Sequence, residues 1–93
     1  MCERFKVCLG QVVATPGALS KLEELGEVSE RFLARHQTGD WGNVCREDWE
    51  ENDRSLESGL RLLSVYKLRD GSKIWIITES DRSATTLLLP SEY

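Results

Sequence analysis

Between residues 15 and 60 the apolar side chains recur at helical spacing. The clearest stripe runs over 16–25. Thr15 can cap its free N–H groups, Pro16 suits the first helical position, and Gly26 is a typical helix end. Two further stripes predict helices over 30–37, with Ser29 as the cap and Gly39 as the stop, and over 47–60, which opens on acidic residues.

From residue 61 onward the apolar period changes to two, which is typical of strands. Strands are predicted over 61–69 and 73–79, on either side of the hairpin signal Asp70-Gly71, and over 84–89, where Pro90 ends the run. The segment 5–14 predicts an N-terminal strand with a bulge at Gly10. We expect 73–79, the most apolar strand, to be central.

This order of elements predicts one α+β domain spanning residues 1–93. We expect two layers. An antiparallel sheet of three to four strands, built from the N-terminal strand and a C-terminal β-meander, would be covered on one face by two or three helices. An exposed edge strand of such a sheet could support a homodimer.

The net charge of −4 argues against direct binding of nucleic acid, because a protein that neutralises phosphates should be basic. The charge is also uneven. Residues 15–59 hold eleven acidic and five basic side chains, whereas the two ends together are mildly basic. Two interpretations stay open: a solvated helical face, or an acidic surface that occupies a nucleic-acid-binding groove on another protein.

Three cysteines, an odd number without a CxxC spacing, favour neither a disulfide framework nor a zinc knuckle. No apolar run reaches the roughly 18–20 residues that a membrane span needs. We therefore expect a cytoplasmic protein that binds no membrane, no metal and no cofactor.

The stretch 35–42, RHQTGDWG, holds the only histidine of the chain. The simpler interpretation is a helix end and a turn, with the positive residues in the last helical turn and Trp41 folded back onto the core. The alternative is a polar pocket for a small anionic ligand such as a nucleotide, formed where this turn meets the 80–83 turn. Its residues would be Arg35, His36, Asp40, Asp81 and Arg82.

The same stretch, followed by WIITESDRSATTLLLPSEY at the C-terminus, resembles a family of small plasmid- and phage-borne proteins, often labelled only "plasmid-related protein". The resemblance covers residues 10–93 and implies an origin in a mobile element or phage. It implies no established active site. A restriction–modification label attached to some members does not suit this chain, because 93 residues cannot hold a methyltransferase domain and no Gly-rich cofactor loop is present.

The leading hypothesis is a non-enzymatic interaction protein that binds a host protein with a basic surface, with inhibition of host defence (anti-CRISPR or anti-restriction action) as its role. No nucleophile-elbow pattern supports catalysis. The rival is a small-ligand binder or an uncharacterised enzyme at the pocket described above, and a transcriptional regulator ranks last. The predicted partner-binding residues are Glu47, Asp48, Glu50, Glu51, Asp53, Glu57 and Trp41.

Overall fold

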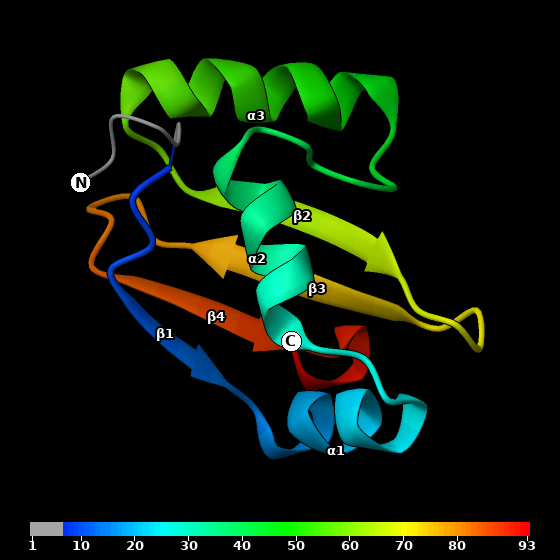
Figure 1. Ribbon diagram of the computed structural model, residues 1–93. Coiled ribbons are helices and arrows are strands. Elements are labelled where there is room, and N and C mark those ends of the chain that lie inside the picture. Colours follow the sequence, from blue (N-terminus) through cyan, green and yellow to red (C-terminus); the bar gives the residue numbers. More distant parts are fainter. Residues whose placement is uncertain (1–6) are drawn as a thin grey trace.

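In the computed structural model, which describes residues 7–93, three helices lie between a first strand and a C-terminal meander (Figure 1). The predicted α+β class is confirmed. Positions 5 and 6 of the predicted first strand lie outside the described residues. The elements are β1 (Gln11–Ala14), α1 (Pro16–Leu25), α2 (Ser29–Gln37), α3 (Arg46–Ser58), β2 (Leu62–Lys67), β3 (Lys73–Thr78), β4 (Ala84–Leu88) and the 3₁₀ turn η1 (Pro90–Glu92).

The ends of the helices follow the local chemistry with two differences from prediction. Thr15 accepts a hydrogen bond from the Ala18 N–H, and Gly26 closes α1 in the left-handed region, as expected. Ser29 is not the cap of α2, because Val28 stands at the N-cap and the Ser29 hydroxyl lies 3.4 Å from the Glu30 carboxylate. The helix α3 ends at Ser58, two residues before the predicted end, because Gly59 takes a left-handed φ of 73°.

The sheet has the strand order β1-β4-β3-β2, and β1 runs parallel to β4. The sheet is therefore mixed, not antiparallel as the sequence led us to expect. Alternating apolar residues determine which face of a strand is buried but carry no information on its direction. The other two pairings are antiparallel, so the meander is confirmed, and β3 is an interior strand as predicted.

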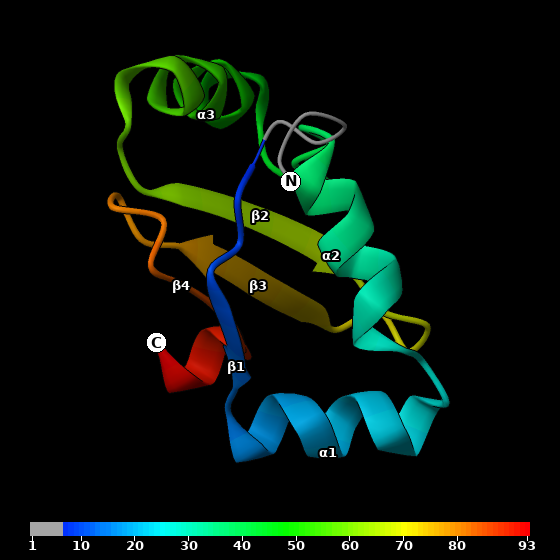
Figure 2. The ribbon, with the colours of Figure 1, turned by 60° about the vertical axis from the view of Figure 1, so that its left-hand side comes forward.

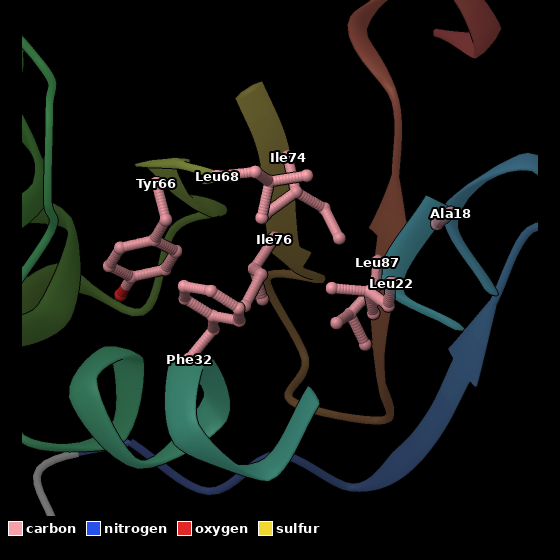
Figure 3. Close-up of a cluster of buried hydrophobic side chains, with 8 residues drawn as sticks. All are labelled: Ala18, Leu22, Phe32, Tyr66, Leu68, Ile74, Ile76 and Leu87. Carbon is pink, nitrogen blue, oxygen red and sulfur yellow. The ribbon is translucent and has the colours of Figure 1, made fainter. Parts of the chain in front are cut away.

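The helix α2 lies across one face of the sheet, α1 lies beside the end where β1 and β4 finish, and α3 runs along the β2 edge (Figures 1 and 2). Under α2 the strand register brings apolar side chains of β2, β3 and β4 onto one face, where Phe32 packs 5.5 Å from Tyr66. Figure 3 shows this core cluster, which consists of Ala18, Leu22, Phe32, Tyr66, Leu68, Ile74, Ile76 and Leu87.

A second buried cluster, formed by Val7, Trp41 and Leu62, lies under α3, with Trp49 and Leu56 packed against it. Trp49 and Trp75 are each half-buried. The expectation about cysteines fails for Cys8, which is disulfide-bonded, while Cys45 is exposed and free. Cys2 lies outside the described residues.

The outer edge of β2 is closed by two asparagines and a segment of backbone. The Asn52 side chain of α3 donates to the Leu63 carbonyl at 2.7 Å and accepts from the Leu63 N–H at 3.1 Å, as a neighbouring strand would. Two residues further on, the Val65 N–H donates to the Trp41 carbonyl, and then the Lys67 N–H donates to the Asn43 side chain. The helix α3 is therefore fixed to the sheet by hydrogen bonds as well as by apolar packing.

We predict that Asn52→Ala lowers the free energy of unfolding by about 2–3 kcal/mol, because it leaves the N–H and C=O of Leu63 without partners. Urea denaturation at pH 7 would measure the loss. The matched control is Glu50→Ala on the exposed side of the same helix, for which we expect a change below ~0.5 kcal/mol. Equal stabilities of the Asn52 variant and the parent protein would show that this edge needs no closure.

Candidate functional site

The acidic residues predicted to bind a partner all lie on α3, and each of them is exposed. Two form short-range ion pairs within the helix, Arg46 with Glu50 and Arg54 with Glu51, between side chains more than half exposed to solvent. Such exposed pairs stabilise a helix by only about 0.3–0.5 kcal/mol and do not remove the carboxylates from solvent. This acidic surface, defined here as Glu47, Asp48, Glu50, Glu51, Asp53 and Glu57, is therefore available for binding.

Trp41, proposed from the sequence as part of the same surface, is fully buried. Its indole N–H donates to the Asp53 carboxylate at 3.0 Å, and its ring lies edge-on to His36 with 5.5 Å between centroids. The loop position suggested exposure, but an indole can bury its rings and still satisfy its one donor. Trp41 therefore supports α3 from below and is not a contact residue.

Arg82 fixes the C-terminal end of α3. It adopts a φ of 59°, in the left-handed region, and its guanidinium donates to the carbonyl oxygens of Leu60 at 2.7 Å and Ser55 at 3.3 Å. Two further bonds reach carbonyls of its own turn, those of Glu79 and Ser80. These four bonds direct the donors of Arg82 at backbone carbonyls, so the side chain acts as a cap for the helix.

A small cavity of about 210 Å³ lies between α3 and the β2 edge. Its lining combines carboxylates and amide or hydroxyl groups with one arginine and two aliphatic side chains: Val44, Asp48, Glu51, Asn52, Ser55, Arg61 and Leu63. The Asn52 side chain is already committed to Leu63, and Arg61 donates to the Tyr93 hydroxyl at 2.8 Å. The cavity is smaller than the ~300–1,000 Å³ of typical small-molecule sites.

The residues predicted for the alternative ligand site make separate contacts, mostly within their own turns, and do not form one pocket. Arg35 and Asp40 form an ion pair at 2.8 Å, and the Arg35 guanidinium lies 4.6 Å from the centroid of the Tyr66 ring. The hydrogen bond from Arg35 lowers the pKa of Asp40. Asp81 accepts from the Ser83 N–H within its own turn. Among residues 7–93 no hydrogen bond or ion pair joins the 35–41 turn to the 80–83 turn.

His36 has no exposed surface and lies within a chain of buried hydrogen bonds. Its Nδ1 is 2.6 Å from the Ser64 hydroxyl, and its Nε2 is 2.8 Å from the Thr78 hydroxyl. The chain continues from Thr78 to Thr85 at 2.8 Å, and Thr85 donates to the carbonyl of Leu9 at 2.7 Å. Although histidine and serine are adjacent here, as in a hydrolase, both are inaccessible to a substrate.

The final acceptor sets the direction of every bond in this chain. Because the Leu9 carbonyl accepts only, Thr85 donates to it and accepts from Thr78. Thr78 then accepts from His36, which places a proton on Nε2. In the neutral ring Nδ1 accepts from the Ser64 hydroxyl. The hydrogen bonds therefore fix the donor at Nε2, and the charge of the ring depends on its surroundings.

The surroundings favour the neutral imidazole. Burial, together with the positive charge of Arg82, lowers the pKa of His36 to about 4. Sequence reasoning did not identify the partners Ser64, Thr78 and Thr85. The available signal was a polar residue at an inward position of each of three otherwise apolar strands.

Several classes of site find no support in the part of the chain that the structure describes. No group of three or more His, Cys, Asp or Glu residues there could hold a metal ion. Every buried side-chain nitrogen and oxygen there has a hydrogen-bond partner. No helix in residues 7–93 combines the length and apolar character of a membrane span.

We predict that stability falls by about 2 kcal/mol between pH 7.5 and pH 5. Below pH 6.5 the unfolded chain binds a proton at His36, but the folded protein does not until pH 4. This window lies above the usual carboxyl pKa range, so the loss reports mainly on the histidine. Urea denaturation at both pH values, with an NMR titration of the imidazole, would measure it. An imidazole that titrates near pH 6.5 in the folded protein would contradict the neutral network.

Comparisons with protein-family models, with curated proteins and with solved structures found no match for this chain. The resemblance to the small plasmid- and phage-borne proteins therefore stays a prediction from the sequence.

Proposed function

We propose that this protein is a non-enzymatic binding protein whose acidic helix α3 docks onto a basic surface of a partner protein. One observation carries the proposal. The helix Arg46–Ser58 holds six acidic side chains and two arginines, a net charge of −4, and the whole chain also has a net charge of −4. The remaining residues are therefore balanced, and the charge excess of the protein is concentrated on one exposed helix.

The attachment of α3 to the sheet supports this use of the helix. Asn52 and Ser55 are buried toward β2. Helical spacing directs Glu47, Glu50 and Glu57 away from that side. Hydrogen bonds of Asn52, Trp41 and Arg82 fix the helix at three places, so the carboxylates project from a rigid support. A preorganised row of like charge speeds association with an oppositely charged surface and reduces the entropy lost on binding.

The other candidate, a ligand pocket or active site, has less support. His36 and Ser64 are fully buried, and the donors of Arg82 are directed at carbonyl groups. The ion pair of Arg35 with Asp40 is complete within one turn. These residues have structural partners, whereas the carboxylates of α3 have few.

A basic groove that normally binds nucleic acid is the partner class that best fits a row of carboxylates, since such grooves are built to accept phosphates. The mobile-element origin implied by the sequence resemblance makes a host-defence protein the specific form of this proposal. Inhibition would then follow from occupation of the groove, without any chemistry by this protein.

We predict that charge reversal at Glu47, Glu50 and Glu57 together to Lys weakens partner binding at least ~10-fold at low salt and leaves the fold intact. Asp53 is left unchanged because it accepts from the buried Trp41 indole. The variant keeps the exposed ion pair of Glu51 with Arg54 and gives up that of Glu50 with Arg46, at a cost of only about 0.3–0.5 kcal/mol. The immobilised protein would be exposed to a bacterial lysate at 50 and 500 mM salt, and mass spectrometry would identify the proteins retained. We expect basic proteins that the higher salt releases.

The matched control reverses Glu23, Glu24 and Glu30, which are exposed acids on α1 and α2. This variant has the same net charge as the α3 variant but an unaltered α3. If both variants lose the partner equally, overall charge and not the acidic helix determines binding. If the α3 variant keeps its partner at low salt, the proposal is wrong. Circular dichroism would confirm that both variants fold.

A further inference from the structure

The two edge strands of the sheet, β2 and β1, differ in how far the rest of the molecule covers them. Along β2, the outward groups of Leu63, Val65 and Lys67 bond to Asn52, Trp41 and Asn43, as described above. Along β1, nothing in the described part of the chain forms a comparable cover, and Figures 1 and 2 both show the outer side of this strand open. Edge strands without cover can accept another strand.

The register of β1 on β4 shows which groups are unused. The Gln11 N–H donates to the Ser83 carbonyl and the Thr15 N–H to the Leu87 carbonyl, so odd-numbered residues face β4. In a parallel ladder the alternate residues face the other way. Val12 and Ala14 therefore present an N–H and a C=O each toward the open edge.

The chemistry around this edge lacks the usual protection against pairing. No charged residue occurs between positions 7 and 20, in a chain that is 30% charged. Val12 and Val13 are 43% and 42% exposed, and they lie on opposite faces of the sheet. Natural edge strands are commonly guarded by lysine or by an inward charge, and β1 has neither.

We propose that β1 pairs with β1 of a second copy of this chain, antiparallel and about a two-fold axis through Val13. In this register Val12 lies opposite Ala14 of the second copy, and the two pairs exchange four hydrogen bonds through the outward groups. Val13 lies opposite its own counterpart in the closely spaced, non-hydrogen-bonded position, so two β-branched side chains pack against each other. The strand is therefore complementary to itself.

The distribution of charge favours a second copy as the occupant. The acidic helix α3 lies along β2, at the opposite edge of the sheet from β1, and the segment at the two-fold axis is neutral. Two acidic proteins can thus meet at the one edge where they do not repel. The paired sheet would have eight strands and would hold the two β2 strands about 34 Å apart, with an acidic helix at each end.

Sedimentation velocity from 5 to 500 µM protein at 150 mM salt would test the pairing. We expect the average mass to rise from 10.6 kDa toward twice that value. The dissociation constant should be ~10–100 µM, since a four-residue edge buries far less than the ~800 Å² per partner of a stable interface. An average mass that stays at the monomer value at 500 µM would overturn the proposal.

Two variants test the register. Val13→Lys places two ammonium groups face to face, and Val12→Pro removes an outward N–H without removing a bond to β4. Each should raise the dissociation constant more than 10-fold. The control Leu19→Lys changes an exposed apolar residue of α1 and should leave the dimer intact. A dimer that survives both edge variants forms elsewhere and contradicts the proposal.

NMR on a mixture of labelled and unlabelled protein gives a direct readout. We expect intermolecular contacts between the Val13 residues of two copies, and contacts confined to any other surface would overturn the proposed register. The test is independent of the proposed function because it alters no residue of α3.

Discussion

One line of buried hydrogen bonds crosses the whole sheet beneath α2 and fixes its four strands relative to one another. It begins at Ser64 on β2, passes through His36 to Thr78 on β3 and Thr85 on β4, and ends at the Leu9 carbonyl just before β1. Each bond depends on the next, because a one-residue slip of any strand would turn its hydroxyl to the opposite face. Apolar side chains could fill the same space, but they would not specify one register. Through His36, the helix α2 therefore helps to fix the register of the strands beneath it.

Several residues of the sequence resemblance also make contacts that hold the fold together. Asp40 accepts from the Gly42 N–H, and Gly42 approaches β2 so closely that a side chain there would collide with the Val65 carbonyl. At the other end of the motif, Glu92 accepts from the Thr15 hydroxyl and the Gly17 N–H, so the last turn of the chain caps α1. A motif of this kind describes how the chain folds. The two proposed binding surfaces, α3 and β1, hold none of the residues quoted for the resemblance.

Features set by local interactions could be predicted from the sequence, and features set by contacts between distant residues could not. The helix α1 could be predicted to its first and last residue because Thr15, Pro16 and Gly26 act locally. The burial of His36 could not, because it depends on partners 28 and 42 residues away. For Trp41 the sequence left a core position and a surface contact both open, and its bond to Asp53 12 residues away decides for the core. The direction of β1 was equally inaccessible, since it is set by its pairing with β4 more than 70 positions along the chain. The acidic surface of α3 was identified correctly as exposed because helical periodicity and charge are sufficient for that inference.

The fold separates the two proposed binding surfaces by the full width of the sheet. The β2 edge is closed by α3, and this closure is also what presents the carboxylates to solvent. The strand β1 itself carries no charge, and the Glu92 carboxylate just beyond its end is held by Thr15 and Gly17. If β1 joins two copies, each dimer carries two acidic helices on one rigid sheet. A partner with two basic sites at a matching separation would then bind both helices, and the second contact would form at a high effective concentration. Weak pairing at β1 and weak binding at α3 would in this way reinforce each other without any new contact.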